Sequence, residues 1–150
     1  MATVFLSWSG SKSKHYARAW HIWISDVFKS ARVFMSDSDI KAGADWRKKL
    51  GSEIRGSKVG IVFVTAKNIR APWILFEAGA LAVAKRRRLI ICIVSGSAAA
   101  LPSPLQAFNA VSADREGAKK VYRALKDDIG KPRAKFSMVW PRLRNLVAGK

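Results

Sequence analysis

The chain contains almost no cysteine. Its single cysteine, Cys92, lies inside the apolar run 89–94. One thiol can form neither an internal disulfide nor a cysteine metal cluster, so we expect Cys92 to be a small core residue in a reducing compartment.

Long apolar segments are also missing. No run approaches the roughly eighteen residues that a membrane-spanning helix needs. The first residues lack the charged region and long apolar core that are typical of a signal peptide. We therefore expect a soluble, cytoplasmic protein without membrane contact. A chain of 150 residues, 49% of them hydrophobic, fits one globular domain around a single core.

Acidic residues are scarce. Ten Asp and Glu residues stand against 28 Lys and Arg residues, which gives a net charge of +18. Such a surface attracts anions, whether nucleic acid, nucleotides or acidic partners. Dispersed charge is also the ordinary pattern of a solvated surface, and the chain has no motif of a known DNA-reading domain. The charge leaves nucleic-acid contact open as a second role.

Short apolar runs alternate with segments of helical spacing. The runs are rich in strand-forming residues and lie at 3–6, 32–35, 59–64, 89–94 and 108–111. Strands that are apolar throughout are buried on both faces, which is typical of a parallel sheet covered by helices. We predict an α/β, flavodoxin-like fold with a five-stranded parallel sheet and helices on both faces.

The helical segments carry their own start and stop signals. Helices are predicted over 16–28, over 46–54, from Pro72, after Asp114 and over 136–147. Asp114 is placed to cap the fourth of these helices and Gly130 to end it.

The carboxyl ends of the strands are the expected ligand edge of such a sheet. This edge would carry the loops 7–11 and 36–44 and the segment that leads to Trp73. The first loop joins a strand to a helix through small polar residues, a common arrangement for holding phosphate on backbone N–H groups. The usual glycine-rich phosphate motifs are absent, so an ordinary capped helix start is the alternative.

Glu77 stands out among apolar neighbours. It is the only acidic residue between Glu53 and Asp114. If a helix starts at Pro72, Trp73 and Glu77 lie one turn apart on the same face. A buried carboxylate needs a function or a cationic partner, because an unpaired buried charge is costly. The alternative places Glu77 on the solvent side of an amphipathic helix.

Four segments occur together in a recognisable order: 4–10 (VFLSWSG), 33–46 (VFMSDSDIKAGADW), 60–65 (GIVFVT) and 71–80 (APWILFEAGA). Together they resemble a bacterial TIR (Toll/interleukin-1 receptor) domain of the NAD+-cleaving type. The resemblance covers roughly residues 3–130. It implies a TIR domain over 1–130 and a helical tail over 131–150 that packs on the same domain.

The resemblance also implies a reaction. Enzymatic TIR domains cleave NAD+ between nicotinamide and ribose, and Glu77 matches their catalytic glutamate. A carboxylate there stabilises the oxocarbenium-like ribose, and the chemistry needs no metal or other cofactor. Small polar residues fill the first loop, where some NAD-cleaving members carry arginines. Trp8 and Trp46 either stack on a base or pack in the core. The residues that would bind NAD+ are Ser7, Trp8, Ser9, Gly10, Ser36, Lys41, Trp46 and Trp73.

Three functions are compatible with these features. The first is an NAD+ glycohydrolase or cyclase in bacterial antiphage defence, which gives ADP-ribose or a cyclic ADP-ribose isomer. TIR–TIR self-association would activate it, and a separate defence effector or sensor could be its partner. The second is a non-enzymatic TIR adaptor, and the third is a basic accessory protein that contacts nucleic acid. A phosphoacceptor receiver is disfavoured, because Ser7-Trp8 and Thr65 stand where it needs acidic residues.

Overall fold

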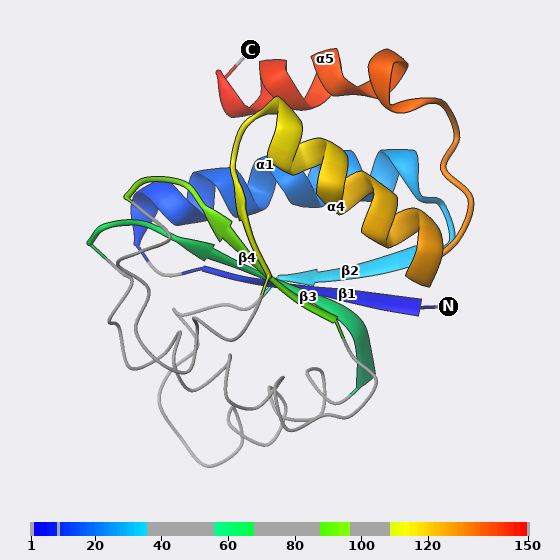
Figure 1. The fold of residues 1–150 in the computed structure, drawn as a ribbon, viewed down its shortest axis with the longest axis horizontal. Coiled ribbons are helices and arrows are strands. Elements are labelled where there is room, and N and C mark those ends of the chain that lie inside the picture. Colours follow the sequence, from blue (N-terminus) through cyan, green and yellow to red (C-terminus); the bar gives the residue numbers. More distant parts are fainter. Residues whose placement is uncertain (1, 9, 36–55, 68–87, 97–108, 150) are drawn as a thin grey trace.

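The computed structural model describes residues 2–8, 10–35, 56–67, 88–96 and 109–149, and all structural statements refer to these. Within them the chain forms five strands and three helices (Figure 1). The helices predicted over 46–54 and from Pro72 lie outside the described residues.

All strands join one parallel sheet in the order β2-β1-β3-β4-β5. This is the flavodoxin-like order, and it confirms the predicted fold class. The strands are β1 (Ala2–Ser7), β2 (Ala31–Met35), β3 (Ser57–Val64), β4 (Arg88–Ile93) and β5 (Asn109–Ser112).

Both faces of the sheet are buried. Leu6 on β1 and Ile61 on β3 are register partners, and both belong to the main hydrophobic core with the helices. The neighbouring Phe5 and Val62 must point to the opposite face, since side chains alternate along a strand. They are equally inaccessible to solvent, as is Ile91 on β4. Burial on both sides explains why the strands are apolar throughout.

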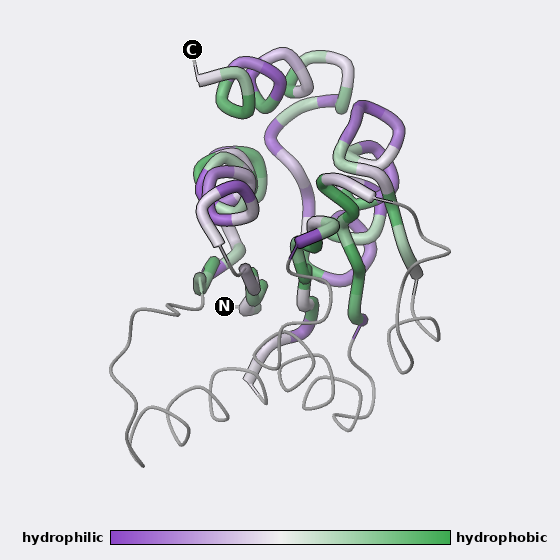
Figure 2. The backbone as a smooth tube through the Cα atoms, turned by 90° about the vertical axis from the view of Figure 1, so that its left-hand side faces the viewer, coloured by the Kyte–Doolittle hydropathy of each residue, from purple (hydrophilic) through white to green (hydrophobic). Residues whose placement is uncertain are grey.

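The three helices lie on one face of the sheet in two layers. They are α1 (Ser11–Val27), α4 (Arg115–Asp128) and α5 (Phe136–Val147). Figures 1 and 2 show α1 and α4 against the sheet, with α5 across both of them on the outside. Apolar residues follow the strands and the inward sides of the helices in Figure 2. None of the helices in the described ranges is long and apolar enough to cross a membrane.

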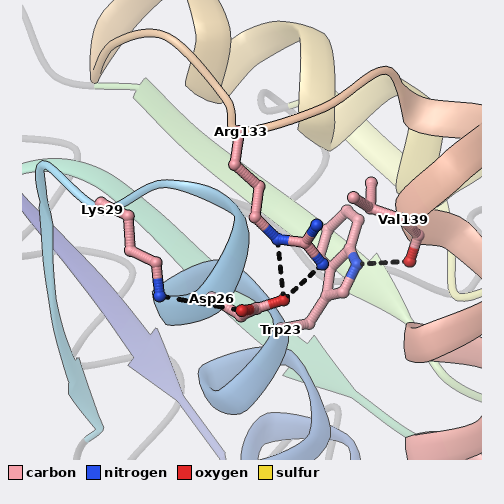
Figure 3. Close-up of polar contacts among 5 residues, drawn as sticks. All are labelled: Trp23, Asp26, Lys29, Arg133 and Val139. Carbon is pink, nitrogen blue, oxygen red and sulfur yellow. Dashed lines mark hydrogen bonds and ion pairs between the residues drawn. The ribbon is translucent and has the colours of Figure 1, made fainter.

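Two tryptophans fix α1 to its neighbours. Trp20 meets Phe63 of β3 edge to face, with ring centroids 5.6 Å apart. Trp23 turns the other way, and its Nε1 donates a hydrogen bond to the Val139 carbonyl of α5 at 3.0 Å (Figure 3). Both side chains are buried, so each contributes a large apolar area as well as a defined ring geometry. α1 begins at Ser11, five residues before the predicted start. The apolar pattern did not reveal its first turn, because that turn is polar.

The predicted helix over 136–147 is confirmed as α5. Phe136 packs edge-on against Trp23 at 6.4 Å and against Tyr122 of α4 at 5.5 Å. The Tyr122 hydroxyl donates to the Ala134 carbonyl at 2.7 Å, and burial raises the Tyr122 pKa. These contacts hold the start of α5 between α1 and α4.

An ion pair ties the connection before α5 to the end of α1. Arg133 donates from Nε and Nη2 to Asp26 Oδ2 at 3.1 and 2.8 Å, and Lys29 Nζ lies 3.7 Å from Oδ1 (Figure 3). The hydrogen bond from Arg133 lowers the pKa of Asp26 below its ordinary value of 3.8. Because the partners are more than one-third exposed, we expect the pair to stabilise the fold by less than about 1 kcal/mol.

Cys92 lies in the core, as predicted. It pairs in register with Phe63 of β3 and is fully buried. Burial raises the pKa of its thiol far above the usual range, so the thiolate form is suppressed in the folded protein.

Candidate functional site

The carboxyl ends of β1, β3 and β4 surround a pocket of about 510 Å³. Because the strand order reverses between β1 and β3, the pocket lies beside the topological switch point of the sheet. This is where parallel α/β sheets place their ligands. The described lining residues are Gly10, Ser11, Lys12, Ser13, Thr65, Ala66, Lys67 and Ser95.

One wall is the first turn of α1. Gly10 precedes the helix at φ 89°, a backbone conformation that residues with a Cβ rarely adopt. Among the described residues no side chain caps this end, and the first turn has no acidic residue. The first N–H groups of a helix have no partner within it, and the helix dipole makes this end positive. The turn is therefore suited to an anionic group such as a phosphate.

The opposite wall joins the ends of β3 and β4. The backbone N–H of Ala66 donates to Ser95 Oγ at 3.2 Å, and the N–H of Val94 donates to the Val64 carbonyl at 2.8 Å. Gly96 lies beside Ala66 at φ 99°, a backbone conformation that favours glycine. Lys67 on this wall is exposed, as is Lys12 on the other. Among the described lining residues cations occur on both walls and carboxylates on neither.

Ser7 and Trp8 are buried and are not among the described lining residues. Trp8 belongs to the core on the α1 side, and the ammonium of Lys14 lies 4.8 Å from the centre of its ring. This cation–π contact covers part of the indole that the sequence offered for base stacking. Ser7 Oγ and Trp8 Nε1 are both buried without a hydrogen-bond partner among the described residues, which is costly for polar atoms.

Of the predicted site residues, the structure thus places Gly10 in the pocket wall and Ser7 and Trp8 in the adjoining interior. The others lie outside the described residues, so their roles stay predictions. They are Ser9, Ser36, Lys41, Trp46, Trp73 and Glu77.

Sequence reasoning did not assign Thr65, Lys67 or Ser95 to the site. Thr65 directly follows β3, and Ser95 comes two residues after the end of β4. Because the carboxyl ends of parallel strands share one edge, the residues that follow each apolar run are the signal that could have found them.

Comparison with known proteins identifies the family of this chain. A family model described as the TIR domain matches residues 4–126. Among solved structures, the chain is similar to one titled the activated Roq1 resistosome directly recognizing the pathogen effector XopQ (TIR domains). That likeness has 22% identity and a TM-score of 0.46, and covers 99% of this chain and 84% of the other.

A putative quinone reductase from Klebsiella pneumoniae is similar at 9% identity and a TM-score of 0.45, covering 99% of this chain and 83% of the other. No protein of curated function matches the sequence. The family model spans most of the chain, from β1 into α4, and the strand order is the flavodoxin-like order that the alternation of apolar runs and helical segments predicted. The chain therefore belongs to the TIR domain family.

Proposed function

We propose that this TIR domain cleaves NAD+ between nicotinamide and ribose. The observation that carries the proposal is the pocket at the carboxyl edge of the sheet. It has the open N-terminus of α1 on one wall, Lys12 and Lys67 on its two sides, and no described carboxylate in its lining. A dinucleotide carries a pyrophosphate, and this set of groups favours such an anion.

Glu77 is the proposed catalytic residue. The glycosidic bond breaks with its electron pair going to nicotinamide, which leaves as a neutral molecule. The ribose carbon becomes positively charged, and the carboxylate stabilises that charge. Attack by water then gives ADP-ribose, and attack by another atom of the same nucleotide gives a cyclic isomer. We propose Ser36, Lys41, Trp46 and Trp73 as further contacts to the nucleotide.

Self-association is part of the proposal. A TIR domain whose site is completed by a second copy is weakly active when dilute, and its specific activity rises with concentration. Antiphage defence is the biological setting that we propose, with ADP-ribose or its cyclic isomer as product.

Nicotinamide release by the purified protein tests this function, measured when dilute and when concentrated. Glu77→Gln keeps the size of the side chain and removes its charge, so we expect turnover to fall by about a hundredfold or more. Glu116→Gln is the matched control, because Glu116 is an exposed carboxylate on the first turn of α4. It should leave turnover unchanged.

The outcomes separate the alternatives. Release that persists in Glu77→Gln would exclude Glu77 as the catalytic residue. No release by the wild type at any concentration, together with binding to other TIR domains, would replace the enzyme with an adaptor. A specific activity that does not depend on concentration would contradict activation by self-association.

A further inference from the structure

The end of α5 contacts α1 one turn beyond the pocket residue Ser11. His15 of α1 donates from Nε2 to the carbonyl of Val147, the last residue of α5, at 2.6 Å. The contact joins residues 132 positions apart. The family model ends at residue 126, so α5 lies beyond the matched segment. A helix outside the family region thus touches α1 beside the candidate site.

The first turn of α1 is weak by its own sequence. Gly10 at the cap position provides no side-chain hydrogen bond, the first turn has no acidic residue, and Lys12 and Lys14 place positive charge at the positive end of the helix dipole. Two contacts to the Gly10 carbonyl hold it locally, from the N–H of Lys14 at 3.0 Å and from Ser13 Oγ at 3.3 Å. A helix start with a glycine at the cap position and like charge at its positive end is less stable than a capped one, so a contact from outside it adds to its support.

His15 is placed to give that support. It follows Ser11 by four residues, so the two side chains lie one turn apart on the same face of α1. Its ring meets Tyr16 edge-on, with centroids 5.9 Å apart. Anchoring His15 to α5 therefore fixes the turn directly behind the pocket residue Ser11.

The rest of α5 is held independently of His15. Trp23 bonds to Val139 near the start of α5, and the Asp26–Arg133 pair secures the connection before it. On α1 these contacts are made by Trp23 and Asp26, near the end of the helix, whereas the pocket wall is its first turn. Loss of the His15 contact should therefore free the first turn of α1 without undocking α5.

We propose that His15 is a positioning residue. Held by the Val147 carbonyl, it keeps residues 11–14 in helical form and so shapes the nucleotide pocket from its α1 wall. The identity of the ligand rests on the proposed function, whereas the link between α5 and this turn does not.

Two readouts on His15→Ala test the proposal. Amide hydrogen exchange at Lys14, whose N–H bonds to Gly10, reports the turn itself. Calorimetric titration with ADP-ribose reports the pocket. We expect Lys14 exchange to accelerate and the ADP-ribose Kd to rise, each by about two- to fivefold, the effect of losing one hydrogen bond. His15→Gln can still donate to Val147 and should restore most of both.

Asp26→Ala is the matched control, since it loosens the other end of the docked tail. It should change neither readout. The proposal is overturned if His15→Ala leaves Lys14 exchange at the wild-type rate, or if Asp26→Ala has the same effect as His15→Ala. Failure of the wild type to bind ADP-ribose would count against the proposed function, and Lys14 exchange would still decide the role of His15.

Discussion

Two helices start at the same edge of the sheet in opposite ways. α4 follows β5 and has a capped N-terminus: Asp114 Oδ1 accepts from the N–H of Gly117 at 2.9 Å, and Glu116 adds a negative charge in the first turn. Gly117 lies so close to β5 that a Cβ there would stand 1.5 Å from the Ser112 carbonyl oxygen. This helix start is thus stabilised by its own side chains.

α1 follows β1 and, among the described residues, has neither a side-chain cap nor an acidic residue in its first turn. Its cap position is Gly10, its first-turn charge is positive, and it borders the pocket. The helix start that borders the candidate site is therefore the one whose cap residue provides no side-chain hydrogen bond and whose first turn has no acidic residue. An open, positive helix end is less stable alone and is available to an anion.

The largest expected effect on stability comes from adding a methyl group where α4 packs against β5. Gly117→Ala forces a methyl group against the backbone of Ser112, so the strand or the helix must move. We expect a loss of about 3 kcal/mol in the free energy of unfolding, measured by denaturant titration. Gly56→Ala is the control, because no atom of the described residues lies within 4 Å of the added carbon. Equal stability of the two variants would show that α4 is not packed tightly on β5.

A smaller effect is expected from removing the cap of α4. Asp114→Ala leaves the N–H of Gly117 without its acceptor and should cost about 1 kcal/mol of unfolding free energy. Nicotinamide release per folded molecule should stay at the wild-type level. A selective loss of turnover would mean that the N-terminus of α4 also belongs to the site. The two helix starts would then no longer differ in function.

The smallest effect on stability should have the opposite sign. Lys12→Glu gives the first turn of α1 the negative charge it lacks, and we expect a gain of about 0.3–1 kcal/mol in thermal or denaturant unfolding. The same change should weaken NAD+ turnover, because it places a negative charge in the lining of the pocket. Lys120→Glu on α4 makes the same change in net charge away from this wall and should leave turnover unaltered. Unchanged turnover in Lys12→Glu would show that this wall does not meet the substrate.

Local signals in the sequence predicted the fold well. The five apolar runs became the five strands, Asp114 became the cap of α4, and the spacing over 136–147 became α5. Each depends on interactions between residues a few positions apart. The pocket could be predicted only as an edge of the sheet, because Thr65 and Ser95 meet the first loop through tertiary packing. The burial of Trp8 and the bond from His15 to Val147 likewise depend on contacts that no periodicity records.

The aromatic contacts between α1 and α5 also set an order of events during synthesis. The hydrogen-bond acceptor of Trp23, the Val139 carbonyl, is synthesised 116 residues later. At ordinary translation rates that interval is on the order of ten seconds. Until then the side of α1 that packs on α5 exposes aromatic surface on the nascent chain. During this interval the protein's own fold does not cover that surface, so protection from aggregation depends on the ribosome and its chaperones.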